Sequence, residues 1–212
     1  MVNVHKAAFI SFMLPCITSL MPAFMPDTDM LYFYIALAIM LLTILAYPIL
    51  LLFFGRKRHE NAARVVLLIN SITFCLFFIF PLIKIYSNYL WMQLLLLGFF
   101  IFCLLFSIYD QRREKPLLFP ERGEENKFSL IFYFFPVVLT LIGGGGNIFI
   151  VREMVLTIGY KPVSIYFSIA FYLIGCWLVC LFMSLNYQGL VKEGLWVKRK
   201  KTSPKNKIPY RA

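Results

Sequence analysis

Charge is scarce in this sequence. Only 15% of its 212 residues are Asp, Glu, Lys or Arg, whereas 61% are hydrophobic and 18% are aromatic. A typical soluble domain is about 45–50% apolar and about 25% charged. The 23 phenylalanines could not all be buried in one small globular core. The composition therefore excludes an ordinary soluble domain and favours an integral membrane protein.

Histidine and cysteine motifs are lacking as well. The chain has only two histidines, His5 and His59, and contains no Cys-x-x-Cys and no Gly-x-Ser-x-Gly. The five cysteines all lie within apolar runs: Cys16, Cys75, Cys103, Cys176 and Cys180. An odd number of cysteines in such positions argues against a disulfide framework or a zinc site, and buried cysteine usually packs as a small hydrophobe. We therefore expect no metal, no cofactor and no catalytic thiol or serine.

Ionisable residues are absent from the centres of the apolar runs. Such residues are costly in a bilayer, and where they occur they usually mark ion paths, proton relays or catalytic groups. Their absence disfavours proton-coupled transport, intramembrane metalloprotease activity and phosphotransferase chemistry at bilayer depth. A channel or carrier lined by hydroxyl groups and backbone is still compatible with the sequence.

Long apolar runs are abundant. A bilayer core of about 30 Å requires about 20 helical residues, and continuous apolar runs indicate helices instead of the alternating strands of a barrel. Six runs meet this description: Ala7–Phe24, Leu31–Phe54, Val65–Ile83, Leu90–Ile108, Ser129–Ile150 and Ser164–Leu185. The sequence predicts an all-α, polytopic membrane bundle over residues 1–185, followed by a basic tail over residues 186–212.

The basic residues predict the orientation of these spans. Alternate loops, together with both ends of the chain, hold 18 of the 21 Lys and Arg residues; the other three are Lys84, Arg152 and Lys161. Because Lys and Arg concentrate on the cytoplasmic side of membrane proteins, this asymmetry predicts that both termini are cytoplasmic. The small, motif-poor chain is typical of bacterial cytoplasmic membrane proteins.

The first run has an alternative interpretation as a signal peptide, because Lys6 precedes an apolar stretch. No small-x-small cleavage pattern stands out before Met25-Pro26, and Pro15 and Pro22 interrupt the run. Cleavage would leave five helices in the same orientation.

One local feature is unusual, namely the four glycines Gly143, Gly144, Gly145 and Gly146, followed by Asn147. Each glycine costs a helix about 1 kcal/mol relative to alanine. One hypothesis is an unwound segment whose carbonyls and Asn147 face a solute, as in broken transporter helices. The alternatives are close helix packing by small residues or the end of the fifth span.

Few polar side chains lie inside the predicted spans. Matching their depths pairs Asn70 with Tyr47 and Gln93 with Asn147. Interhelical hydrogen bonds of this kind contribute only about 0.6–2 kcal/mol in membranes. We therefore expect structural contacts between helices at these positions instead of a substrate site.

The tail combines a tryptophan with a basic cluster: Trp196, Lys198, Arg199, Lys200 and Lys201. Each basic residue near an anionic leaflet contributes about 1 kcal/mol of attraction. We expect this tail to face anionic lipids at the cytoplasmic surface, either as a lipid or partner sensor or as a topogenic anchor. Because the basic residues lie between and after apolar runs and no nucleic-acid motif occurs, the net charge of +11 does not predict nucleic-acid binding.

Three functional hypotheses follow. The leading one is a non-catalytic protein that binds another membrane protein, such as an accessory subunit of a transporter or secretion system or an immunity protein. The second is a small transporter or channel for an apolar or weakly polar solute that uses the glycine segment. An integral membrane enzyme is the least favoured.

Overall fold

The computed structural model describes residues 9–54, 59–113, 116–118, 127–142 and 148–192. All regular secondary structure within these ranges is helical. The helices are α2 (Met13–Thr18), α3 (Leu20–Phe24), α4 (Met30–Phe54), α5 (His59–Ile85), α6 (Leu90–Gln111), α7 (Lys127–Ile142), α8 (Ile148–Ile158) and α9 (Tyr160–Lys192). The predicted all-α class is thus confirmed for the described residues.

Four of these helices are long and apolar enough to cross a membrane. Their candidate spans are Met30–Phe53, Ala62–Ile85, Leu90–Gln111 and Tyr160–Gly189. They coincide with the second, third, fourth and sixth spans predicted from the sequence. The chain is therefore consistent with a membrane protein.

The other two predicted spans correspond to shorter helices. The stretch Phe9–Phe24 contains α2 and α3 and lies along α5. The predicted span Ser129–Ile150 is divided between α7, which ends at Ile142, and α8, which begins at Ile148. At 1.5 Å per residue, the 16 residues of α7 extend about 24 Å, less than the thickness of a typical hydrocarbon core.

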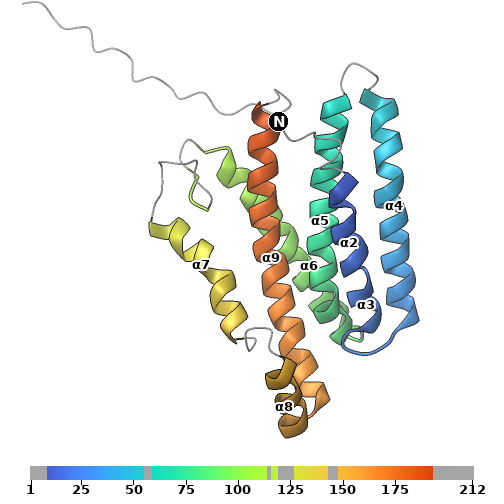
Figure 1. The fold of residues 1–212 in the computed structure, drawn as a ribbon, viewed down its shortest axis with the longest axis vertical. Helices are drawn as coiled ribbons and strands as arrows, with labels where there is room; N and C mark the ends of the chain where they lie inside the picture. Colours follow the sequence, from blue (N-terminus) through green and yellow to red (C-terminus); the bar gives the residue numbers. More distant parts are fainter. Residues whose placement is uncertain (1–8, 55–58, 114–115, 119–126, 143–147, 193–212) are drawn as a thin grey trace, which may run out of the picture.

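Helices α2 and α3 run in the same direction, after which α4, α5, α6 and α7 alternate, and α9 runs opposite to α7 (Figure 1). The end of α4, the start of α5 and the end of α9 lie at the upper end of the view in Figure 1. The α3–α4, α5–α6 and α8–α9 junctions lie at the opposite end, called the lower end below.

Helices α5 and α9 form the centre of the bundle. Their interface is the most extensive in the fold, and α6 packs mainly on α9. Half of the α5 span is buried, whereas only 17% of the α4 span and 17% of the α6 span are. The core lies between α5, α6 and α9 and includes Ile79, Leu96 and Val179. The other faces of α4 and α6 are apolar and exposed, as lipid contact requires.

Gly175 brings α5 and α9 together. A Cβ atom at this position would lie 3.0 Å from Ile79 Cγ2, 3.0 Å from Phe78 Cβ and 3.1 Å from the Cys75 carbonyl oxygen. Such close approach of backbones at small residues is common between membrane helices. Any side chain larger than hydrogen would separate the two central helices.

Helices α6 and α9 are joined by hydrogen bonds at several depths. The Tyr172 hydroxyl donates to the Leu96 carbonyl at 2.8 Å, and the Ser107 hydroxyl donates to the Cys180 carbonyl at 2.9 Å. Ser107 and Ser184 also share a hydrogen bond of 3.2 Å. Because hydrocarbon offers no partners, these contacts satisfy polar groups that would otherwise be costly to bury.

The α8–α9 junction is a tight turn at Gly159, whose φ of 91° is readily available only to glycine. Glycine is the common residue just after a helix, and proline is tolerated in the first turn of the next, as at Pro162. The segment around Arg152 and Lys161, which was predicted to connect the fifth and sixth spans, is therefore largely helical. Arg152 lies in α8 and Lys161 lies in the first turn of α9.

Candidate functional site

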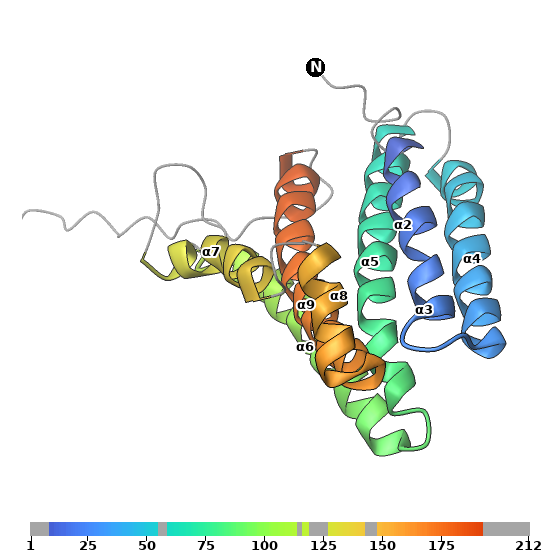
Figure 2. The same cartoon turned by 60° about the horizontal axis from the view of Figure 1, so that its bottom comes forward.

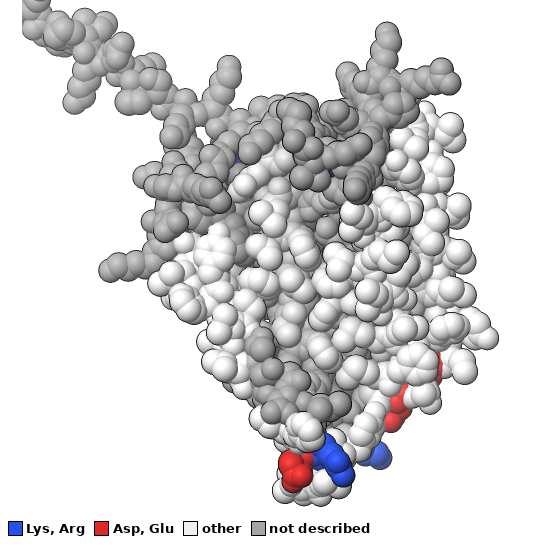
Figure 3. Space-filling model, viewed as in Figure 1, with Lys and Arg blue, Asp and Glu red and all other residues white. Residues whose placement is uncertain are grey.

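A cavity of about 310 Å³ with both charged and apolar lining residues lies at the lower end of the bundle. It is formed by the α3–α4 connection, the last turn of α5 with the residues after it, and the first turns of α9. Ten residues line it: Pro26, Asp27, Thr28, Asp29, Lys84, Ile85, Ser87, Lys161, Ser164 and Ile165. Figure 3 shows that acidic and basic atoms gather clearly at this end of the molecule, whereas the broad middle of the visible face is uncharged.

Lys84 is the most deeply buried cation among the lining residues, with only 7% of its surface exposed. Its Nζ donates to the carbonyl oxygens of Pro22 at 3.1 Å and Ala23 at 3.4 Å, and also to the carbonyl oxygen of Asp27. The ammonium group lies 5.6 Å from the centre of the Tyr32 ring, within the range of a cation–π contact. Lys84 thus ties the end of α5 to the end of α3, where helix carbonyls have no intrahelical partner.

Two further hydrogen bonds hold the α3–α4 connection in place. Asp29 Oδ1 accepts from the Leu31 backbone N–H at 2.9 Å, so Asp29 caps the start of α4. The Tyr160 hydroxyl donates to the Pro26 carbonyl at 2.5 Å and joins the connection to α9. The cavity wall is therefore attached to both central helices.

A buried carboxylate lies at the opposite end of the bundle. Asp110, in the last turn of α6, is fully buried. Its carboxylate accepts from the Leu117 N–H at 3.0 Å and from the Leu118 N–H at 2.9 Å. Asp110 lies just beyond the predicted span Leu90–Ile108, and these backbone donors compensate for the burial of its charge.

The interior polar side chains contact residues of other helical segments. Asn70 Nδ2 donates to Ser11 Oγ at 2.7 Å, and Gln93 Nε2 donates to the Tyr32 hydroxyl at 3.3 Å. The pairing of Asn70 with Tyr47 stays a prediction. The predicted partner of Gln93, Asn147, lies outside the described residues.

Three thiols converge between α6 and α9. Cys103 lies within side-chain hydrogen-bonding reach of Cys176 and Cys180, and the Cys180 thiol lies 3.7 Å from the Cys103 carbonyl oxygen. All are free thiols and pack in the hydrophobic core, as does Cys75. Within the described ranges, no three His, Cys, Asp or Glu side chains are arranged to hold a metal ion.

Helix α7 is attached to the bundle through an unusual hydrogen bond. Pro136 has no N–H to donate to the Phe132 carbonyl four residues earlier. The Trp177 indole N–H of α9 donates to that carbonyl at 2.8 Å instead. The proline thus creates an acceptor on α7, and the tryptophan uses it to join the two helices.

The remaining predicted site residues lie outside the described part of the chain. They are the glycine segment Gly143–Gly146 with Asn147, and Trp196 with the basic cluster Lys198–Lys201. Their predicted roles stay predictions.

No protein-family model, no curated protein and no solved structure matches this chain. Sequence reasoning missed Lys84 and Asp110 as buried groups, because each appeared simply to flank an apolar run. The available signal was that both charges directly adjoin such runs, where burial at a helix end is feasible.

Proposed function

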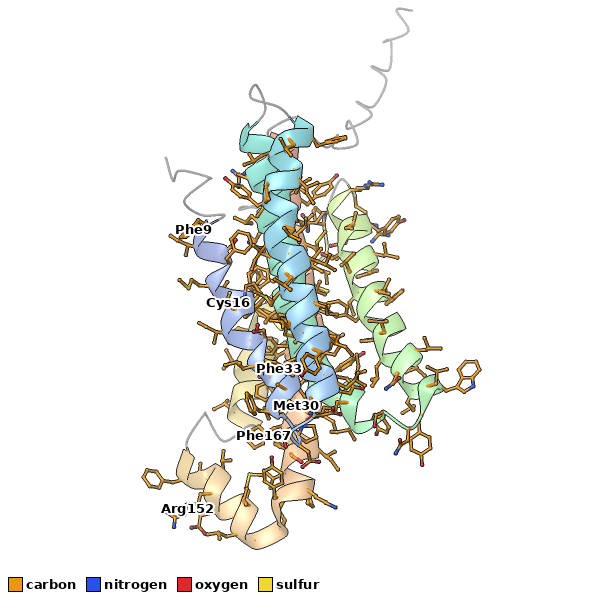
Figure 4. The ribbon with its side chains drawn as sticks, turned by 90° about the vertical axis from the view of Figure 1, so that its right-hand side faces the viewer. Phe9, Cys16, Met30, Phe33, Arg152 and Phe167 are labelled. Atoms are coloured by element: carbon orange, nitrogen blue, oxygen red, sulfur yellow. The ribbon has the colours of Figure 1, made fainter. Side chains whose placement is uncertain are left out.

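We propose that the chain crosses the membrane six times, with both ends in the cytoplasm, and that it binds a second membrane protein along α7. The distribution of Lys and Arg supports this orientation, since Lys84, Arg152 (Figure 4) and Lys161 belong to the lower end. The alternating helix directions support an even number of crossings. The shorter helices, Phe9–Phe24 and α7, then cross with local thinning of the bilayer.

The orientation can be tested by labelling single cysteines in a background without the native ones. Ser87→Cys, between α5 and α6, should react with a membrane-impermeant maleimide added to intact cells. Arg113→Cys, after α6, should react only once the membrane is permeabilised. The opposite pattern would invert the proposed topology, and labelling of both sites in intact cells would rule out an alternating arrangement.

The observation that carries the partner proposal is the position of α7. Both Figure 1 and Figure 2 show α7 at the edge of the bundle, inclined to its neighbour α9. Helix α9 is its main packing partner among the described helices. Most of the surface of α7 is therefore left to lipid or to another protein.

The exposed side of α7 is apolar and partly aromatic, and we call it the α7 face. It comprises Leu130, Ile131, Tyr133, Phe134, Val137, Val138 and Leu141, which are all at least 50% exposed. A helix shorter than the bilayer favours association, because contact with another protein removes part of the mismatch with lipid. An accessory subunit or an immunity protein acts through a surface of this kind.

Photo-crosslinking in native membranes tests the proposal. A photoreactive amino acid at Phe134 of α7, which is 57% exposed, should capture one membrane protein of defined mass. The matched control is Leu41 of α4, which is 53% exposed and should capture lipid only. Lipid adducts alone at both positions would refute a partner on the α7 face. Capture of a second copy of the chain would replace the heterologous partner with self-association.

A further inference from the structure

The cavity at the lower end has a balanced set of charges. It is lined by two acidic residues, Asp27 and Asp29, and two basic residues, Lys84 and Lys161. A ligand of one charge sign would leave the opposite groups uncompensated, whereas a ligand with both signs complements them. We infer that this cavity binds a small zwitterion, a molecule with an ammonium group and an anionic group a few ångströms apart. The inference is independent of the partner proposed for α7.

The lining charges are not equally available. The ammonium of Lys84 is already held by three backbone carbonyls, and Asp29 Oδ1 caps α4. Lys161 and Asp27 are the two exposed charges of opposite sign on the cavity wall. Lys161 is therefore the group that would pair with the anionic part of the ligand, and Asp27 with its ammonium group.

The dipoles of the two helix ends at the cavity favour the same orientation of the ligand. The first turn of α9 carries Lys161, and the partial positive charge of a helix N-terminus adds to that of the ammonium. The last turn of α5 lies on the cavity at Ile85, where helix carbonyls carry partial negative charge. A zwitterion oriented with its anion toward α9 is thus favoured over the reverse orientation.

The volume limits the size of the ligand. Ligand pockets commonly span about 300–1,000 Å³, so a cavity of about 310 Å³ suits a small molecule. One water occupies about 30 Å³ in the liquid, which leaves room for an amino acid or a phosphoethanolamine group with a few waters. Ile165 lines the cavity and is 41% exposed, so one wall is apolar and open to the outside. The same chemistry could come from a free zwitterion or from the headgroup of an ethanolamine phospholipid.

Binding to the purified full-length protein tests the inference. Titration calorimetry should detect saturable binding of glycine or O-phosphoethanolamine, but not of ethanolamine or inorganic phosphate alone. Lys161→Gln and Asp27→Asn should each weaken binding about tenfold or more by removing one charged contact. Asp27→Asn keeps the backbone carbonyl that holds Lys84, so the cavity wall is preserved.

Arg152→Gln and Glu153→Gln are the matched controls, because they make the same changes in charge on exposed residues of α8. Figure 4 shows Arg152 at the lower end with its side chain pointing away from the bundle. Neither residue lines the cavity, so binding should be unchanged.

Native mass spectrometry separates the two sources. Ethanolamine phospholipid retained by the wild-type protein, and lost in Lys161→Gln and Asp27→Asn, would indicate a lipid headgroup. Binding of the free zwitterions without retained lipid would indicate a soluble ligand. The inference is overturned if neither occurs, if ethanolamine or inorganic phosphate alone binds as tightly as the zwitterions, or if Arg152→Gln weakens binding as much as Lys161→Gln. The comparison of probes on the wild-type protein is decisive even if a variant fails to fold.

Discussion

Replacing Gly175 with alanine tests the central interface of the bundle. The new methyl group would lie 3.0 Å from Phe78 Cβ and 3.1 Å from the Cys75 carbonyl oxygen. Both atoms are fixed to the backbone of α5 and cannot rotate away, unlike the nearby Cγ2 of Ile79. The methyl group can therefore be accommodated only if α5 and α9 separate.

The magnitude follows from two opposing effects. Overpacking a core by a methyl group typically costs about 1–3 kcal/mol, whereas exchanging glycine for alanine within a helix gains about 0.5–1 kcal/mol. We expect Gly175→Ala to lower the free energy of unfolding by about 1–2 kcal/mol. Gly98→Ala in α6 is the matched control, because no atom lies within 4 Å of the added Cβ. That variant should be neutral or more stable.

Thermal unfolding in mild detergent, followed by the loss of the monodisperse peak in size-exclusion chromatography, measures the difference. A change of 1 kcal/mol corresponds to about 2–4 °C in a chain of this size, so the midpoint of Gly175→Ala should lie about 2–8 °C below that of the wild type and at least as far below that of Gly98→Ala. Equal midpoints for the two variants, or a higher one for Gly175→Ala, would refute the close packing of α5 on α9.

Three further predictions concern single contacts. Trp177→Phe should lower the free energy of unfolding by about 1 kcal/mol. The loss should be smaller in a Pro136→Ala background, because the backbone N–H at position 136 can then donate to the Phe132 carbonyl. Equal losses on both backgrounds in unfolding experiments would contradict the hydrogen bond between α9 and α7. Asp110→Ala should cost about 1–3 kcal/mol and speed proteolysis after α6, because two backbone N–H groups lose their acceptor; an unchanged cleavage rate would argue against that role. Replacing the four basic residues 198–201 with glutamine should weaken the binding of a tail peptide to anionic vesicles by up to about 1 kcal/mol per residue. Equal binding of the original peptide to neutral and anionic vesicles would exclude electrostatic attraction.

The long helices could be predicted because each apolar run is bounded by polar residues. Leu90–Ile108, for example, becomes α6 over Leu90–Gln111. The helix extends slightly beyond the predicted limit and includes Asp110, whose buried carboxylate accepts hydrogen bonds from the backbone N–H groups of Leu117 and Leu118. Hydropathy alone does not contain this information.

The start of α9 could have been predicted more closely. Gly159 followed by Pro162 combines a glycine that ends one helix with a proline that suits the first turn of the next. The C-terminal end of α9 was harder to predict from the sequence. Helix α9 continues through Lys192, beyond the predicted limit at Leu185, and Asn186 and Tyr187 are buried. Their burial depends on neighbouring helices instead of local composition.

The partners of polar side chains could be predicted only by depth. Depth does not specify which face of a helix is turned toward which neighbour, and Gln93 meets Tyr32 of α4. The cavity at the lower end was also inaccessible to sequence reasoning. The contacts of Lys84 span sequence separations of 57 to 62 residues, so only the folded chain brings them together.

The position of α9 in the sequence has a consequence for biosynthesis. Helices α5 and α6 have their most extensive described interfaces with α9, the last described helix to be synthesised, and not with each other. Because domains form from the N-terminal end during synthesis, the earlier helices enter the membrane before their main partner exists. Ser107 of α6, for instance, forms its hydrogen bonds with Cys180 and Ser184 only after α9 has been synthesised. The core between α5, α6 and α9 can therefore form only after α9 is made, and a nonsense mutation ahead of α9 would remove it while leaving the contacts of α5 with α2, α3 and α4.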